Sequence, residues 1–453
     1  MKVDTPRDLA LRVLNDLSRK PGFSAGLLDH LFRARPDLEE RDRAFISQLV
    51  QGAIRWRGRL DWTIRQASNV SLKRISPPVL NILRLALYQV LFLDRVPESA
   101  AVNEAVKQAK KGQPPYVVSF VNAVLRKVCR TKDTLTFPDR GNTPVEYMSA
   151  FHSYPEWLVR KWIREWGADF TETLLETQNR IPSLTIRSNP LKIDREALLR
   201  RLEEESGIAG KPTPYSPQGV HLPDFRGRVD QYRAFQEGLF QVQDEAAQLT
   251  SFLLSPAAGE TVLDLCAGYG GKTTHIAELM GDRGKVIALD MNRARLISLA
   301  TNTARLGIRS ALAVGADASE DLSSLFRVRF DRIVVDAPCS GLGVLSRHPD
   351  GKWNKKEQDI TRLAELQQAI LNNGCSLLRS GGTLLYVTCT LSREENEEVV
   401  DACLEVNKDV ALLDLKDRAP LWARDLIDDR GFLRTFPHLH GMDGFFGALM
   451  MKR

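Results

Sequence analysis

From residue 241 onward, the chain alternates between short apolar runs, which are typical of buried strands, and longer segments with helical periodicity. The candidate strands are residues 261–266, 285–290, 310–315, 330–336, 382–389, 409–414 and 445–451. The candidate helices that separate several of them are residues 272–280, 292–306, 357–379 and 392–406. Because parallel strands must be joined by crossover connections, this alternation predicts a parallel sheet with helices on both faces. Residues 241–453 are therefore expected to form an α/β domain.

The first 140 residues show helical periodicity, and they are expected to form an all-α helical bundle. Residues 79–93 are apolar on nearly every side, which is typical of a core helix, and Pro77-Pro78 suits the first turn of that helix. Residues 141–240 mix helical and strand-like segments, which indicates a small α+β module. The sequence thus predicts three domains, over residues 1–140, 141–240 and 241–453.

Charge is unevenly distributed along the chain. Residues 1–140 contain 25 Lys and Arg against 14 Asp and Glu, a net charge of +11, whereas the remainder has a net charge of −5. A basic domain of this kind favours a polyanionic partner such as nucleic acid, because basic side chains attract phosphates whatever the base sequence. The alternative is an ordinary solvated surface.

The composition favours a cytoplasmic location. The N-terminal residues are polar and lack the apolar core of a signal peptide, and the most apolar stretch, residues 79–93, is too short and too polar to span a bilayer. The cysteines are Cys129, Cys266, Cys339, Cys375, Cys389 and Cys403. Because they lack the spacing of metal ligands or of a disulfide framework, we expect reduced thiols, no bound metal and no membrane partner.

A glycine-rich turn follows the first strand of the α/β domain. Residues 263–273 read Leu-Asp-Leu-Cys-Ala-Gly-Tyr-Gly-Gly-Lys-Thr, which predicts a strand, a turn and the start of a helix. Glycines let a ligand approach the backbone closely, and a helix N-terminus favours a negative group such as a carboxylate. The segment is not a P-loop, because that motif requires glycine where this chain has Cys266. The dinucleotide-binding pattern fails as well, because Thr273 replaces its last glycine.

Three aspartates follow successive strands of the predicted sheet. Asp290 ends the second strand, Asp317 follows the third and Asp336 ends the fourth. Ligands bind beyond the carboxyl ends of parallel strands, where Asp290 would suit ribose hydroxyls and Asp317 an adenine amino group. Together with the glycine turn, the series favours S-adenosylmethionine as cofactor. NAD is the weaker alternative, because the turn lacks a pyrophosphate-binding pattern.

Two cysteines also follow strands of the same sheet. Cys339 closes the segment Asp336-Ala337-Pro338-Cys339, and Cys389 lies between two threonines. A thiolate that adds to carbon 6 of cytosine makes carbon 5 nucleophilic enough to take a methyl group from a sulfonium, while an acid near the ring nitrogens offsets the developing charge. One carboxylate and one thiol are the minimum for this chemistry, and a second thiol would help in release. The spacing alone leaves open which cysteine is the nucleophile.

These motifs resemble the Nop2/Sun family of RNA 5-methylcytosine methyltransferases, over residues 145–453. Further segments that match the family are residues 243–247, 347–353, 434–437 and 443–446. The resemblance implies a Rossmann-like class I methyltransferase domain. It also implies that Cys389 is the nucleophile, that Cys339 assists product release and that Asp336 hydrogen-bonds the target base.

The resemblance further implies how the cofactor is held. Lys272 is expected to meet the methionine carboxylate of S-adenosylmethionine, Asp290 the ribose and Asp317 the adenine. The full set of expected cofactor-binding residues is Cys266, Ala267, Gly268, Tyr269, Gly270, Gly271, Lys272, Asp290, Asp317 and Asp336. Lys352 is expected to contact RNA or the active site. Gly268-Tyr269 departs from the Ala-Pro usual in the family, which leaves the turn freer and bears on cofactor affinity.

The N-terminal domain resembles the RNA-binding antitermination factor NusB, over residues 5–130. The matching segments are residues 41–45, 102–106 and 120–126. The fusion implies a bacterial methyltransferase that acts on 16S ribosomal RNA, naked or in an early assembly particle, and we expect a monomer. The basic side chains that would contact phosphate, or simply solvate a helix face, are Arg55, Arg57, Arg59, Lys73 and Arg74. The alternatives are a non-catalytic RNA-binding ribosome assembly factor, a cytosine-C5 methyltransferase acting on another RNA, and a DNA methyltransferase.

Overall fold

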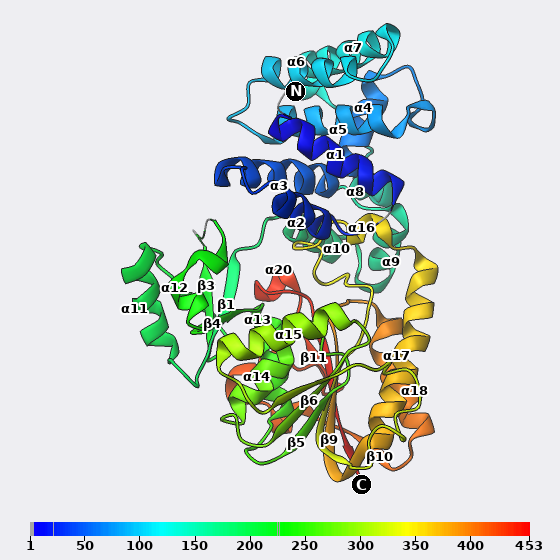
Figure 1. Cartoon of the computed structure of the whole chain (residues 1–453). Coiled ribbons are helices and arrows are strands. Elements are labelled where there is room, and N and C mark those ends of the chain that lie inside the picture. The colour runs from blue at the N-terminus through cyan, green and yellow to red at the C-terminus, as the bar shows by residue number, and fades with distance from the viewer. Residues whose placement is uncertain (1–3, 21, 224, 226) are drawn as a thin grey trace. The chain divides into compact units, whose positions relative to one another are not determined.

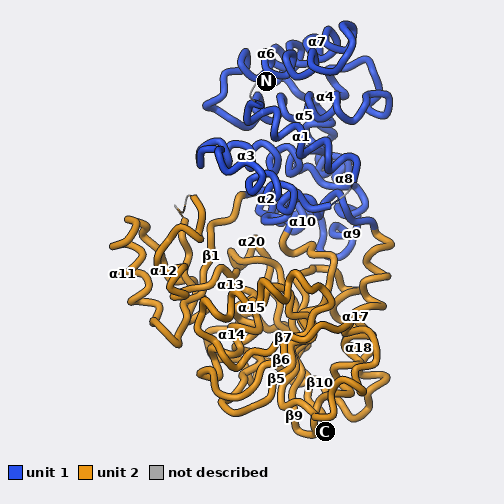
Figure 2. The backbone as a smooth tube through the Cα atoms, viewed as in Figure 1, with its two compact units in different colours: residues 1–180, 345–356 blue, residues 181–344, 357–453 orange. Residues whose placement is uncertain are grey.

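The structure is a computed structural model that describes residues 4–20, 22–223, 225 and 227–453. The chain forms two compact units (Figure 2). Unit 1 comprises residues 1–180 and 345–356, and unit 2 comprises residues 181–344 and 357–453. Residues 345–356 thus belong to unit 1 by packing, although they interrupt unit 2 in sequence. Within the described ranges, no helix combines the length and the apolar character that a membrane span requires.

Unit 1 is built from α-helices (Figure 1). They are α1 (Pro6–Arg19), α2 (Ser24–Ala34), α3 (Glu40–Arg55), α4 (Arg57–Ala67), α5 (Pro77–Phe92), α6 (Glu98–Lys110), α7 (Pro115–Thr131), α8 (Pro144–Phe151), α9 (Glu156–Trp166), α10 (Ala168–Gln178) and the short α16 (Gly351–Asn354). Helix α5 begins at Pro77, whose missing N–H is not needed in a first turn. Its side chains are buried on nearly every side, in one apolar cluster with α1, α3, α6 and α7. The predicted helical bundle is confirmed.

Helices α8 to α10 also belong to unit 1, although they lie beyond residue 140. The guanidinium carbon of Arg59, on α4, lies 4.6 Å from the ring centroid of Phe151 and 5.2 Å from that of Phe137. Aromatic side chains on both sides of residue 140 therefore pack around one cation. The domain boundaries at 140 and 240 stay a prediction.

Unit 2 begins with a small antiparallel sheet in the order β2-β3-β1-β4. Its elements are β1 (Leu184–Ser188), α11 (Arg195–Ser206), β2 (Lys211–Pro212), β3 (Gly219–Leu222), α12 (Arg233–Gln236) and β4 (Phe240–Val242). Ile186, Val220 and Phe240 from three of the strands pack with Leu198 of α11 in a separate small core. This is the α+β module that the sequence predicts.

The second sheet of unit 2 has the order β10-β12-β9-β8-β5-β6-β7, with β11 paired to β12. Its strands are β5 (Thr261–Asp264), β6 (Lys285–Leu289), β7 (Ala311–Val314), β8 (Phe330–Asp336), β9 (Leu378–Thr388), β10 (Val410–Leu413), β11 (Leu433–Arg434) and β12 (Phe446–Lys452). Its helices are α13 (Glu245–Leu254), α14 (Gly271–Leu279), α15 (Arg293–Leu306), α17 (Glu357–Leu377), α18 (Glu397–Val406), α19 (Leu415–Arg418) and α20 (Pro437–His440).

The sheet is mixed, whereas the sequence pattern predicts a parallel one. Strands β5 to β9 run parallel, but β12 is antiparallel to both β9 and β10. The chain reaches β12 from β11 through a short connection that holds only α20, and β11 pairs with it antiparallel. A connection too short for a crossover can only reverse the chain direction, which is why β12 departs from the parallel pattern.

Two apolar clusters cover the two faces of this sheet. Successive residues of a strand alternate between them, as Leu384 and Leu385 of β9 do. One cluster packs against α17 and α18, which lie side by side in Figure 1, and the other against α13 and α14. Both faces of the sheet are therefore covered by helices. Side chains of several strands meet at the carboxyl ends of the parallel strands, which we call the carboxyl edge of the sheet.

Candidate active site

The glycine turn joins the end of β5 to the start of α14. Gly268 and Gly270 both have positive φ, of 55° and 84°. A Cβ at Gly270 would stand 2.8 Å from Leu299 Cγ, so glycine is required there for conformation and for space. Gly268 has no atom within 4 Å of the position where a Cβ would stand, so the backbone at this turn is open to a ligand.

Asp290 is tied directly to the glycine turn. Gly268 N donates to Asp290 Oδ2 at 2.9 Å, and Asn292 N donates to Asp290 Oδ1 at 2.7 Å. One carboxylate thus holds the glycine turn beside the start of α15. Asp317 is half-buried and accepts from the backbone N and the hydroxyl of Ser319, which lower the pKa of its carboxyl group.

The aspartates at and after the strand ends place negative charge around the thiol of Cys266. Burial raises the pKa of the Cys266 thiol well above its ordinary value, and the charges of four aspartates raise it further. These are Asp264, Asp336, Asp290 and Asp317. The three aspartates that the sequence singles out, Asp290, Asp317 and Asp336, therefore lie close enough to Cys266 in the glycine turn to raise the pKa of its thiol.

Lys272, in the first turn of α14, and Asp336, at the end of β8, form an ion pair at the carboxyl edge of the sheet. Lys272 Nζ lies 2.6 Å from Asp336 Oδ2 and 5.3 Å from the ring centroid of Phe445. The lysine side chain is almost fully buried, whereas about a third of the Asp336 side chain is exposed. The lysine that is expected to meet the cofactor carboxylate and the aspartate that is expected to bind the target base thus contact each other.

Tyr269 occupies the turn position where the Nop2/Sun family usually has proline. Its side chain is 67% exposed, and the guanidinium carbon of Arg295 lies 6.0 Å from its ring centroid. Ala267 and Gly271 keep the rest of the turn in place through their backbones: Ala267 N donates to Leu289 O, and Gly271 O accepts from the buried Arg187. The departure at Tyr269 therefore leaves the hydrogen bonding of the turn intact.

The two strand-end cysteines face each other. Cys339 Sγ and Cys389 Sγ are 3.3 Å apart, and both side chains are half-buried. The hydrogen bond to Cys389 is the main cause that raises the pKa of Cys339, and burial is the second cause. The two sulfurs are thus within hydrogen-bond distance, and either thiol can be the donor.

A residue that sequence reasoning missed, Glu395, holds the two cysteine loops together. It lies in the 3₁₀ turn Arg393–Glu395 and its side chain is fully buried. Its carboxylate accepts from Ser340 N at 2.8 Å and Ser340 Oγ at 2.5 Å, and from Thr390 Oγ1 at 3.3 Å. Ser340 and Thr390 immediately follow the two cysteines. The available signal was a run of acids close after Cys389, which is indistinguishable in sequence from a solvated helix start.

Lys352 does not lie in this site. Its side chain is fully buried in unit 1, where Nζ donates to Asn179 Oδ1 at 2.6 Å and to the carbonyl oxygens of Arg55 and Ser153. The ammonium also lies 3.7 Å from the ring centroid of Tyr154. The expectation that Lys352 contacts RNA or the active site is therefore wrong, because packing against Asn179 and Tyr154 encloses the whole side chain.

Family models match three successive parts of the chain. The NusB family matches residues 4–130, the RsmF/B-like ferredoxin-like domain residues 154–227, and the 16S rRNA methyltransferase RsmB/F family residues 251–451. No group of three or more metal-binding side chains occurs among the residues that the structure describes. The predicted fold class, a NusB-like bundle followed by an α+β module and a Rossmann-like methyltransferase domain, is confirmed.

Individual relatives agree with the family models. The chain is 37% identical to the probable ribosomal RNA small subunit methyltransferase B of Bacillus subtilis, over 100% of both chains. The crystal structure of PH0851 is 28% identical, with a TM-score of 0.81 over 99% of both chains. The structure of NSun6 from Pyrococcus horikoshii, solved with the S-adenosylmethionine analogue SFG, is 25% identical, with a TM-score of 0.58 over 67% of this chain and 99% of that one. The chain belongs to the RsmB/F family of ribosomal RNA small subunit methyltransferases.

Proposed function

We propose that this protein transfers a methyl group from S-adenosylmethionine to carbon 5 of a cytosine in 16S ribosomal RNA, through a covalent bond between Cys389 and carbon 6 of the ring. The observation that carries the proposal is the pair of sulfur atoms 3.3 Å apart beyond the ends of β8 and β9. Membership of a ribosomal RNA methyltransferase family supports the substrate class. The reaction is proposed to take place in the cytoplasm, on a monomer, with naked RNA or an early assembly particle.

The residues at the glycine turn fit S-adenosylmethionine. Gly268 leaves open space beside the backbone, and Lys272 supplies a cation for a carboxylate. Asp290 and Asp317 supply acceptors for ribose hydroxyls and an adenine amino group. When bound there, S-adenosylmethionine supplies an electrophilic methyl group on a sulfonium.

The contact between the thiols supports a reaction that uses both cysteines. Their sulfurs lie 3.3 Å apart, and either thiol can donate the hydrogen. The residue pattern leaves open which sulfur attacks carbon 6, and the family resemblance implies that it is Cys389.

The chemistry then uses Asp336 and both thiols. Cys389 gives its proton to solvent, and its sulfur bonds to carbon 6 as the electron pair of the carbon 5–carbon 6 double bond is released into the ring, which lets carbon 5 bond to the methyl group. The exposed part of the Asp336 carboxylate accepts a hydrogen bond from the 4-amino group of cytosine, a donor that uracil lacks. The carbon 5 proton next passes to a base, its electron pair restores the ring double bond, and the carbon–sulfur bond breaks to return a thiolate to Cys389.

Cys339 ionises more readily at the moment when release requires a base. Bonding of the Cys389 sulfur to carbon removes the hydrogen bond and the charge interaction with Cys389, which are two of the three largest causes of the raised pKa of Cys339. The thiol of Cys339 then gives its proton to solvent more readily, and the thiolate that remains takes the carbon 5 proton. This gives the second cysteine a physical reason to act in release and not in attack.

The test uses two variants with opposite expected results. Cys389→Ala should abolish 5-methylcytosine formation in 16S ribosomal RNA, measured by bisulfite sequencing, because no sulfur can activate carbon 5. Cys339→Ala should still form the bond between Cys389 and carbon 6 but should release the product slowly. A covalent protein–RNA adduct should therefore accumulate and be visible on denaturing gels. Cys129→Ala, on α7 of unit 1, is the matched control and should behave like the wild type. Normal methylation by Cys389→Ala would refute the assignment, and a missing adduct would remove the release role of Cys339.

Two further measurements separate the alternatives. Calorimetric titration with S-adenosylmethionine distinguishes an enzyme from a non-catalytic assembly factor, which need not bind the cofactor. Competition between 16S ribosomal RNA, other RNAs and DNA distinguishes the three cytosine-containing substrates. Failure to bind S-adenosylmethionine would overturn the proposal as a whole, whereas a preference for another nucleic acid would change only the substrate.

A further inference from the structure

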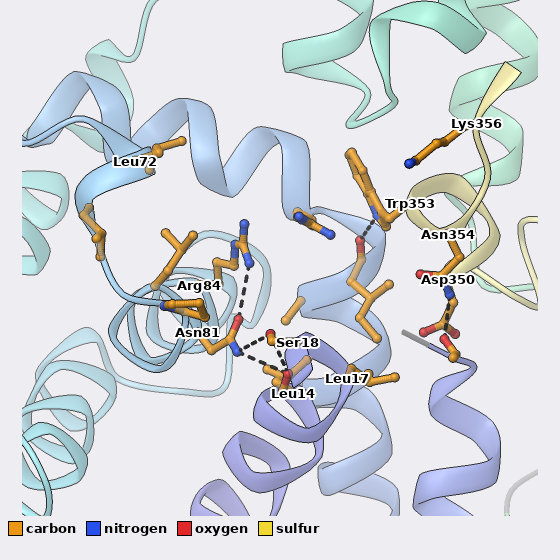
Figure 3. A pocket seen from close by; sticks show the side chains of 17 residues that line it. Leu14, Leu17, Ser18, Leu72, Asn81, Arg84, Asp350, Trp353, Asn354 and Lys356 are labelled. Atoms are coloured by element: carbon orange, nitrogen blue, oxygen red, sulfur yellow. Dashed lines mark hydrogen bonds between the residues drawn. The ribbon is translucent and has the colours of Figure 1, made fainter. Parts of the chain in front are cut away.

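Unit 1 contains a cavity of about 530 Å³ that none of the chemistry above uses. Its floor is apolar and is formed by side chains of α1, α3 and α5 and of the segment before α5: Leu14, Leu17, Ala53, Ile54, Leu72, Ile75 and Leu80. One wall is formed by residues 345–356, here called the α16 segment, which contribute Asp350, Trp353, Asn354 and Lys356 (Figure 3). The cavity therefore exists only where residues 345–356 fold against the helical bundle.

Hydrogen bonds hold the α16 wall firmly in place. Asp350 accepts from Ser24 N at 3.2 Å and from Ser24 Oγ at 2.7 Å. Trp353 Nε1 donates to Ile54 O at 2.8 Å, and Asn354 Nδ2 donates to Gly22 O at 2.6 Å. The indole ring of Trp353 is thereby fixed as a flat side of the cavity.

Most polar side chains of the opposite side already have partners. Arg84 makes two hydrogen bonds of 2.7 Å to the carboxylate of Asp61 and a third to Asn81 Oδ1. Asn81 Nδ2 donates to Leu14 O and to Ser18 Oγ, as Figure 3 shows. These groups form a closed network, so they shape the cavity without offering a free charge to a ligand.

Arg57 is different. Its guanidinium carbon lies 5.2 Å from the ring centroid of Trp353, and its side chain is exposed. Among the residues that the structure describes, it has neither a hydrogen-bond partner nor a salt bridge. Asp350, the acid that lines the cavity, is occupied by Ser24. The cavity thus combines an apolar floor, a fixed aromatic ring and a guanidinium whose donors are available for an anion.

We propose that this cavity receives one unstacked nucleotide of single-stranded ribosomal RNA, with its base against Trp353 and the apolar floor and its phosphate on Arg57. Proteins bind splayed RNA bases by stacking them on aromatic rings and arginine planes, and they hold the phosphate with arginine. The net charge of +11 in residues 1–140 attracts the same polyanion. The site lies in unit 1 and does not depend on which base the catalytic residues modify.

The test measures the affinity of the full-length protein for a 16S ribosomal RNA transcript, with three variants. Arg57→Gln removes the phosphate-binding charge and should weaken binding about tenfold, because a hydrogen bond to a charged group is lost. It should also lower the slope of log affinity against log salt by about one unit. Leu17→Trp fills the cavity without a change of charge and should weaken binding to a similar extent. Arg65→Gln, on the same helix α4 and also exposed, is the matched control for charge and should bind like the wild type.

Photo-crosslinking and free nucleotides complete the test. Ultraviolet irradiation of the complex should yield RNA-crosslinked peptides that contain Trp353, and Leu17→Trp should suppress them. Equal weakening by Arg57→Gln and Arg65→Gln, with no effect of Leu17→Trp, would mean general electrostatics and would overturn the proposal. Calorimetric binding of the four nucleoside 5′-monophosphates that is lost in Arg57→Gln, while RNA affinity stays unchanged, would make this a free-nucleotide site and would overturn it as well. Melting temperatures of the variants identify any that fail to fold, and Arg57→Gln alone keeps the proposal testable if Leu17→Trp does.

Discussion

The thiol of Cys339 shows how one neighbour sets the chemistry of a residue. The hydrogen bond with Cys389, whose sulfur lies 3.3 Å away, raises the pKa of Cys339, and burial raises it further. Because the thiolate is the reactive form, Cys339 should react slowly with alkylating reagents in the resting protein. The two cysteines are thus coupled to each other although they follow different strands of the sheet.

Cys389→Ala should make Cys339 more reactive toward iodoacetamide. The substitution removes the hydrogen bond that is the main cause of the raised pKa, so the pKa falls and alkylation accelerates at lower pH. Each unit by which the pKa falls increases the thiolate fraction about tenfold at any pH below the pKa. Labelling rates followed by mass spectrometry from neutral to alkaline pH measure this shift. Cys129, whose pKa of about 11 is set by burial and by Glu98, serves as internal control, and an unchanged profile for Cys339 would contradict the coupling.

At the scale of elements, the active site depends on how the loops after β8 and β9 are joined. Glu395 receives hydrogen bonds from the residue after each cysteine, and Gly343 N donates to Cys389 O at 2.9 Å. Burial raises the pKa of the Glu395 carboxyl group, and the hydrogen bonds of Ser340, Gln367 and Thr390 oppose that effect. The distance between the two sulfurs is therefore maintained by a buried acceptor that contacts neither of them.

Glu395→Gln should lower the rate of methylation without weakening cofactor binding. The amide replaces one acceptor oxygen by a donor that faces other donors, which costs roughly 1–3 kcal/mol and loosens the two loops. In a Cys339→Ala background the same change should reduce the yield of covalent adduct on denaturing gels, while calorimetry shows unchanged S-adenosylmethionine affinity. Glu398→Gln, on the exposed side of α18, is the control. Normal adduct yield with a lowered melting temperature would mean that Glu395 only stabilises the fold.

At the scale of the whole molecule, residues 345–356 connect the two units through the chain itself. They leave unit 2 shortly after the Cys339 loop and return to it at α17, but their side chains pack in unit 1. Lys352 is fully enclosed there, and Trp353 and Asp350 hydrogen-bond residues of the helical bundle. Unit 1 is thus incomplete without a segment that the sequence places in the catalytic half.

A fragment of residues 1–180 should melt at a lower temperature than a mixture of that fragment with a synthetic peptide of residues 345–356. The peptide restores partners for Ser24, Asn179 and the Ile54 carbonyl, and binding to the folded state alone raises stability by mass action. Differential scanning calorimetry at increasing peptide concentration measures the effect. A peptide with Trp353→Ala and Lys352→Ala is the control. Identical melting with and without the native peptide would show that the fragment does not need this segment.

The pattern of the sequence was sufficient for much of the fold and the site. Strand–helix alternation after residue 241 predicts the sheet, and the apolar stretch at 79–93 predicts α5, because both depend on local periodicity. The glycine turn and the aspartates that share one end of the sheet were identified for the same reason, since each follows a strand and parallel strands bring their ends together, while their role in cofactor binding stays a prediction. Two features were not apparent from the sequence: β12 runs antiparallel to β9, and α8 to α10 belong to unit 1. Both depend on which surfaces pack against each other.

Local order along the chain therefore determined the kind of domain and which cysteines and aspartates follow its strands. Tertiary packing decided that the sulfurs of Cys339 and Cys389 lie 3.3 Å apart and that Glu395 joins the two cysteine loops. It also decided that the side chains of Lys352 and Trp353 pack in unit 1. The physical reason is the range of the interactions. Periodicity and turn geometry act between residues close in sequence, whereas burial, charge coupling and hydrogen bonds between Asn179 and Lys352, or between Ser340 and Glu395, depend on distances that exist only after folding.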